Sequence, residues 1–181
     1  DICTQITKEG IQIFEGSMTP LELSALIQEV KKLPPHSEIV EVGLNAGISA
    51  AAMLASNPTL SLISFDLGEW DCAKRAAELL AEKFPGRHQA VWGDSKQTLL
   101  RLSNRYELVV IDGGHDYPTA YSDIHTLARL AKLVFIDDTN MEPVKRAVNH
   151  AIFMNEITLL REDMEKEGWV PRAWGLYRGQ A

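Results

Sequence analysis

Acidic and histidine side chains follow two short apolar runs in the second half of the chain. Asp112 and His115 come after one run, and Asp137 and Asp138 follow the next. Runs this short and this rich in Val, Ile and Leu are typical of buried parallel strands. Because neighbouring parallel strands end at the same edge of a sheet, we expect the three carboxylates to lie close together.

Three carboxylates around one point repel one another unless a cation neutralises them. Mg²⁺ or another hard divalent cation takes oxygen ligands, and three carboxylates leave about three of its six positions for water and an acceptor. A bound cation lowers the pKa of a hydroxyl that it holds. A histidine ordinarily titrates at about pH 6.5, which suits a general base. We therefore predict a metal site at Asp112, Asp137 and Asp138, with His115 as the catalytic base.

A glycine turn in the first half of the chain could hold a cofactor. Glu41-Val-Gly43-Leu-Asn45-Ala-Gly47 lies between an expected strand and an expected helix. Gly43 permits a tight turn, Gly47 permits close packing, and N–H groups at the helix start would face a ligand. Asp66 ends the next strand, where it can accept hydrogen bonds from a ribose. The G-x-x-x-G spacing fits a cofactor without phosphate better than a dinucleotide.

Each motif also has a purely structural interpretation. The glycines could only turn the chain while Asp66 caps a helix. Asp112 and Asp137 could cap the segments that follow them, with Asp138 solvated and His115 exposed on a loop. Sequence alone does not fix which strands are neighbours, so these alternatives stay open.

The elements that would position these residues alternate between strands and helices. This order predicts a Rossmann-like, doubly wound α/β sheet of about seven strands, mostly parallel, with an antiparallel C-terminal hairpin and helices on both faces. We expect one domain over residues 1–181, with an N-terminal segment and helix at 1–35 and the Rossmann-like core at 36–181. Expected strands are 38–42, 60–65, 88–92, 108–111, 133–136, 157–160 and 174–177. One expected helix begins at Pro20 and is stopped by Leu33-Pro34-Pro35, and the others are 48–56, 71–84, 95–102, 118–130 and 142–155.

Composition excludes several other classes of protein. Apolar residues make up 45%, charged residues 24%, and the formal net charge is -7, so the balance is globular and a nucleic-acid partner is disfavoured. The two cysteines form no disulfide framework or metal-ligand spacing. We see no apolar run long enough for a membrane span and no signal peptide. We therefore expect a cytoplasmic protein with no membrane partner, and we leave open whether it is a homo-oligomer.

The Glu-x-Gly-x-x-x-Gly turn and the acidic strand end resemble motifs I and II of class I S-adenosylmethionine-dependent methyltransferases (EC 2.1.1), over about Met18 to Tyr177. The resemblance implies S-adenosylmethionine as cofactor. It places the methionine part at the glycine turn and the ribose at the acid. By position, the implied cofactor residues are Met18, Glu41, Gly43, Asn45, Gly47, Ser49, Asp66, Asp94, Ser95 and Asp112. Ser17 and Thr19 flank Met18 in the segment that covers the cofactor in catechol-type relatives.

The acids and His115 resemble the metal-dependent O-methyltransferase branch, which includes methyltransferase family 24 and the macrocin- and catechol-type enzymes. The resemblance implies a divalent cation at Asp112, Asp137 and Asp138, and a base at His115, where catechol-type enzymes carry lysine. Asp138 departs from the catechol pattern, which has asparagine there. The implied acceptor is a hydroxyl on a small molecule or sugar.

Two other functions remain as alternatives. The chain could bind S-adenosylmethionine as a methyltransferase-like module without catalysis. It could also be a nicotinamide-dependent oxidoreductase, since Asp66 would suit a ribose there too. Four aromatic side chains are further candidates for lining the cleft: Trp70, Trp92, Tyr117 and Tyr121.

Overall fold

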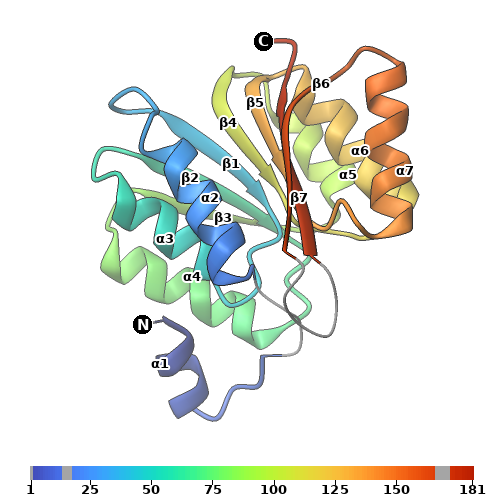
Figure 1. Cartoon of the computed structure of the whole chain (residues 1–181). Helices are drawn as coiled ribbons and strands as arrows, with labels where there is room; N and C mark the ends of the chain where they lie inside the picture. Colours follow the sequence, from blue (N-terminus) through green and yellow to red (C-terminus); the bar gives the residue numbers. More distant parts are fainter. Residues whose placement is uncertain (1, 14–17, 166–171) are drawn as a thin grey trace. The chain divides into compact units, whose positions relative to one another are not determined.

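The structure is a computed structural model that describes residues 2–13, 18–165 and 172–181. The chain divides into two compact units, residues 1–94 and 95–181. Figure 1 shows the helices and strands of both, coloured along the sequence. The division at residue 94 does not test the predicted single domain, which stays a prediction.

The first unit contains three parallel strands in the order β3-β2-β1. They are β1 (Glu38–Val42), β2 (Ser61–Asp66) and β3 (His88–Trp92). Four helices accompany them: α1 (Ile2–Lys8), α2 (Pro20–Val30), α3 (Ile48–Ser56) and α4 (Asp71–Lys83). Ile39, Val40 and Leu62 are buried in the core, as expected for strands covered on both faces.

Local sequence explains where α2 begins. Thr19 accepts a hydrogen bond from the Glu22 N–H, and the Glu22 carboxylate accepts one from the Thr19 N–H. This capping box satisfies two N–H groups at the helix start, and Pro20 fits the first helical position. The predicted start of this helix is therefore confirmed.

The second unit has four strands in the order β4-β5-β7-β6. β4 (Tyr106–Ile111) and β5 (Ala131–Ile136) are parallel, whereas β7 (Arg172–Arg178) runs antiparallel to β5 and to β6 (Thr158–Glu165). Figure 1 shows β6 and β7 side by side at the red end of the colour bar. The other elements are α5 (Ser95–Thr98), the 3-10 turn η1 (Leu99–Arg101), α6 (Tyr117–Ala128) and α7 (Glu142–Phe153).

The predicted fold class is confirmed: the described residues contain seven strands, mostly parallel, with an antiparallel C-terminal pair. The sequence did not predict α1. Its segment is rich in β-branched residues, which lowers helix propensity, and the helix is followed by a tertiary ion pair between Glu9 and Arg75 of α4. Among the described residues, no helix has the length and apolar character that a bilayer crossing requires.

Candidate active site

The glycine turn after β1 is a left-handed loop organised by Asp66. Gly43, Asn45 and Gly47 have φ angles of 95°, 44° and 72°. Asp66 Oδ2 accepts hydrogen bonds from the N–H groups of Leu44 at 3.0 Å and Asn45 at 3.2 Å. The carboxylate of the next strand therefore fixes the backbone of the predicted cofactor turn.

Asp66 keeps capacity for a ligand. Its Oδ1 accepts a hydrogen bond from the Gly68 N–H at 2.8 Å, and each carboxylate oxygen has two lone pairs. One lone pair on Oδ1 is thus left for a donor such as a ribose hydroxyl. The residue fits its predicted role, and it also holds the turn.

Glu41 lies fully buried in β1 between two serines. Ser49 donates a hydrogen bond to its Oε1, and Ser64 donates one to its Oε2. Burial raises the pKa of Glu41 to about 7, although both serine bonds oppose the shift. Ser64 also lies 3.1 Å from Nε2 of His88, whose pKa burial lowers to about 4. Glu41 and Ser49 therefore bind each other inside the unit.

Large apolar side chains lie exposed next to Asp66. Leu67, Trp70 and Trp92 are 59%, 38% and 41% exposed. They follow or end β2 and β3, at the strand ends where α/β sheets bind ligands. Leu67 was missed by the sequence reasoning; its place directly after the acidic strand end was the available signal. This apolar group suits the faces of an adenine ring.

The remaining predicted cofactor residues lie at element ends. Met18 is buried and precedes α2, Asp94 is exposed at the end of the first unit, and Ser95 begins α5. Ser17 lies outside the described residues. Gly47 packs tightly, since a Cβ there would lie 3.1 Å from Cβ of Ala76 in α4.

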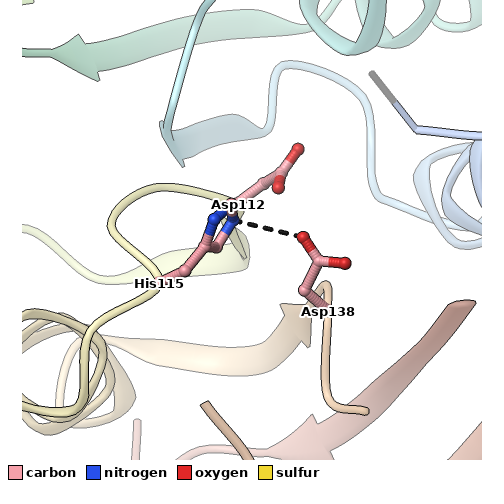
Figure 2. Close-up of side chains that lie close together, drawn as sticks. All are labelled: Asp112, His115 and Asp138. Carbon is pink, nitrogen blue, oxygen red and sulfur yellow. Dashed lines mark ion pairs between the residues drawn. The ribbon is translucent and has the colours of Figure 1, made fainter. Parts of the chain in front are cut away.

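In the second unit, the ends of β4 and β5 bring Asp112, His115 and Asp138 together (Figure 2). Each offers one ligand atom, and these atoms lie within 4.8 Å of one another. The parallel register pairs Ile111 with Ile136, so both strands end at the same level. The structure thus places two of the three predicted metal ligands beside the predicted base.

Asp137 is not part of this group. Its side chain is buried, and its Oδ1 accepts a hydrogen bond from the Asp138 N–H at 2.9 Å. Its own N–H donates to the Ile111 carbonyl at 3.0 Å. Asp137 therefore shapes the backbone at Asp138, which has a left-handed φ of 52°, a conformation that is costly for a residue other than glycine.

Asp138 is buried and holds a basic group at each oxygen. His115 Nε2 lies 3.2 Å from Oδ2, drawn as a dashed line in Figure 2, and Arg172 Nη1 lies 2.8 Å from Oδ1. Burial alone would raise the pKa of Asp138, but the His115 hydrogen bond and the Arg172 charge together hold it below its usual range. Asp138 is thus an ionised carboxylate at neutral pH.

Arg172 was missed by the sequence reasoning. It is the first residue of β7, whose antiparallel register pairs Gly175 with Ile136 at the end of β5. The start of β7 therefore lies beside the residues that follow β5. The available signal was its type and place, since it is a basic residue at the start of the last antiparallel strand. That signal leads to Asp138 only once the register between β5 and β7 is known.

Tyr117 and Tyr121 are stacked on each other along α6 and pack against α7. The hydroxyl of Tyr117 lies 2.6 Å from His150 Nδ1, and the Tyr121 ring stacks on the His150 ring with centroids 4.3 Å apart. These contacts join the two helices, and they account for both tyrosines without a ligand.

Comparison with known proteins decides the family. Residues 40–139, more than half of the chain, match the family described as "Methyltransferase domain". The chain belongs to this family. The match begins in β1 and ends just after Asp138, so it spans the glycine turn, Asp66, Asp112 and His115 of this methyltransferase domain.

One relative and two solved structures are also similar to this chain. A Mycobacterium sp. (strain JLS) protein named "Putative O-methyltransferase" is 30% identical over 110 residues, which are 59% of this chain and 49% of the relative. The chain thus spans about half of that relative. Cofactor-bound Rv0187 from MTB superposes with a TM-score of 0.82 at 14% identity, over 98% of this chain and 88% of that one. The O-methyltransferase from Bacillus cereus in complex with SAH gives 0.80 at 11% identity, with the same coverage.

The predicted class is confirmed: this is a class I S-adenosylmethionine-dependent methyltransferase domain with the fold of O-methyltransferases. The family match gives no support to the nicotinamide-dependent alternative. The roles of individual residues remain predictions and are proposed below.

Proposed function

We propose that this methyltransferase transfers the methyl group of S-adenosylmethionine to a hydroxyl oxygen of a small molecule or sugar, assisted by a divalent cation. The observation that carries the proposal is the grouping of Asp112, His115 and Asp138 within 4.8 Å in a chain of this family. An aspartate-held histidine is suited to removing a proton from a hydroxyl.

The first unit supplies residues that fit the methyl donor. The glycine turn offers carbonyls for the methionine part, and the start of α3, which has no side-chain cap, offers backbone N–H groups. Asp66 has a lone pair for the ribose, and Trp70 and Trp92 offer apolar faces. Met18, Asn45 and Asp94 of this unit are proposed as further contacts, and Ser95 and Asp112 are the contacts proposed from residues 95–181. S-adenosylmethionine supplies an electrophilic methyl group, so the protein mainly has to align the acceptor oxygen.

His115 is proposed as the catalytic base. Its Nε2 faces Asp138, and Nδ1 is proposed as the nitrogen that takes the proton of the acceptor hydroxyl. The ionised Asp138 fixes the ring orientation and stabilises the imidazolium that forms, as aspartate does for histidine in hydrolytic triads. The side chain of His115 is 44% exposed, so an acceptor can reach it.

Asp112 and Asp138 are proposed to hold the cation. Their two carboxylates form an oxygen donor set, which fits a hard divalent cation without requiring Asp137. When bound, such a cation lowers the pKa of a coordinated hydroxyl. Asp137 orients the Asp138 backbone. A neutral imidazole has only one acceptor nitrogen, so a His115 that ligated the cation could not also take the substrate proton. His115 is therefore proposed to act from outside the coordination sphere.

The net charge of -7 supports a small acceptor rather than a nucleic acid, since an acidic surface repels phosphate. A cytoplasmic location stays a prediction, and whether the protein is a homo-oligomer stays open.

The proposal is tested by a methyl-transfer assay. S-adenosylmethionine with a labelled methyl group is incubated with the protein and a small-molecule extract, and the products are fractionated by mass. Label should enter the low-mass fraction only. Asp112→Asn should abolish it, and His115→Gln should lower it roughly a hundredfold or more. A chelator should stop transfer until a divalent cation is restored.

Asp137→Asn is the matched variant, because asparagine keeps an oxygen to accept the Asp138 N–H. It should retain most activity. A loss of activity in Asp137→Asn as complete as in Asp112→Asn would instead show that Asp137 is a metal ligand. Full activity in chelator would show that the reaction needs no cation. Label in the macromolecular fraction would refute a small acceptor.

A further inference from the structure

Arg172 is the one basic side chain that the described structure gives Asp138 besides His115. Its Nη1 lies 2.8 Å from Oδ1, and the Asp138 side chain is only 6% exposed. A carboxylate this deeply buried needs a charged or hydrogen-bonding partner, because an uncompensated buried charge is strongly unfavourable. Arg172 supplies that partner from a different strand.

The backbone fixes Arg172 at this place. The Thr139 N–H donates to the carbonyl of Ala173 at 2.8 Å, and the Ala173 N–H donates to Oδ1 of Asn140 at 2.9 Å. These two bonds join the segment that follows β5 to the first residues of β7. The guanidinium is therefore delivered to Asp138 by main-chain geometry, unlike a surface ion pair that depends on two long flexible side chains.

The two carboxylate oxygens of Asp138 therefore have different partners. Arg172 takes Oδ1, and Oδ2 faces His115. Without Arg172 the carboxylate could rotate about its terminal torsion, which is broad and roughly two-fold for aspartate. The oxygen that orients His115 would then no longer be fixed.

We infer that Arg172 is a positioning residue for the proposed methyl transfer: it locks the Asp138 carboxylate so that Oδ2 orients His115 toward the acceptor. The inference rests on the proposed function, and it goes beyond it by adding a residue outside the matched region 40–139. Arg172 contacts Asp138, and the proposed role acts through that carboxylate.

The test compares Arg172→Gln, Arg172→Lys and Arg172→Ala in the labelled-methyl assay. We expect Arg172→Gln to lower kcat about 10- to 100-fold, the usual loss when an outer partner of a site residue is removed, while calorimetric affinity for S-adenosylmethionine is unchanged. Arg172→Lys should recover part of the loss, since it restores the charge but not the planar fork. Millimolar guanidinium should partly restore Arg172→Ala.

Arg161→Gln is the matched control. Arg161 and Asp163 both belong to β6, the strand next to β7, and Arg161 Nε lies 2.6 Å from Asp163 Oδ2. The substitution removes this arginine–aspartate pair, which is not one of the proposed site contacts. It should keep wild-type kcat, and thermal unfolding of every variant reports whether it folds.

A folded Arg172→Gln with wild-type kcat would overturn the inference alone. So would a loss that neither lysine nor guanidinium reverses, because that pattern indicates structural damage. Absence of methyl transfer by the wild-type protein would instead refute the proposed function, and the inference with it.

Discussion

Glu41 shows how one buried residue can set the pH dependence of stability. Its pKa is raised by burial to about 7, against 4.5 for an ordinary glutamate. Between these values the folded protein keeps a proton that the unfolded chain releases. The free energy of unfolding should therefore fall as pH rises from about 4.5 to about 7, and the loss should be complete above that range.

Glu41→Gln should remove this slope. One pKa unit is worth about 1.4 kcal/mol, so the variant should gain up to roughly 3 kcal/mol relative to wild type between pH 4.5 and 8. The serine hydroxyls can rotate to accept from the new amide. Urea unfolding at several pH values measures the difference.

Glu38→Gln, on the same strand, is the control for the simple loss of a negative charge. If the free energy of unfolding of Glu41→Gln changed with pH in parallel with that of the wild type, Glu41 would titrate normally in the folded state.

At the same scale, the sequence indicated which residues lie together at the candidate site better than it indicated what each of them contacts. Asp112, His115 and Asp138 could be chosen because acids and a histidine at two strand ends share one edge of a sheet. Asp137 and Asp138 are adjacent, and residue types alone do not predict that the Asp137 carboxylate accepts the Asp138 N–H while the Asp138 carboxylate faces His115. Arg172 depends on the register between β5 and β7, which residue types alone do not encode.

At the scale of elements, the start of α3 depends on a glycine. Gly47 has a φ of 72°, and a Cβ there would lie 3.1 Å from Ala76 Cβ and 3.3 Å from Leu80 Cδ1 of α4. Gly86 has nearly the same φ, 73°, but nothing lies within 4 Å of the position that a Cβ would take there. The two glycines therefore separate backbone strain from crowding.

Both Gly47→Ala and Gly86→Ala should lose roughly 1–2 kcal/mol of unfolding free energy for the left-handed backbone. Gly47→Ala should lose about 1–3 kcal/mol more, because the methyl group forces α3 away from α4. Chemical denaturation of both variants measures the two losses. Equal losses would show that α4 yields to the methyl group without cost.

Periodicity and capping signals predicted most elements within a few residues. β1, α3 and β3 have the predicted bounds, since Gly, Pro or polar turns flank each run. The C-terminal strands are longer than predicted, because their mostly charged ends lack the apolar pattern that marks a strand. α1 went unpredicted because it packs against α4, which lies far away in the sequence.

At the scale of the whole molecule, the fold alone does not choose the acceptor, because function resides in sites placed on a fold. The acidic net charge and the group at Asp112, His115 and Asp138 are the observations behind the proposal that the acceptor is a hydroxyl that loses its proton to a base. The methyl donor is the part of the reaction that family membership fixes most directly.

Binding of the donor's product can therefore be tested on the intact chain without knowing the acceptor. A ligand that binds only the folded state stabilises it by about 2.7 kcal/mol at a concentration 100 times its Kd. S-adenosylhomocysteine should raise the thermal unfolding temperature by several degrees, since about 1 kcal/mol shifts a domain of this size by roughly 2–4 °C. NAD should cause no shift. The stabilisation should persist in chelator, because the residues proposed to bind the cofactor, the glycine turn and Asp66, need no cation for it, whereas methyl transfer should stop. A shift with NAD but none with S-adenosylhomocysteine would contradict the assignment of the glycine turn and Asp66 to this cofactor.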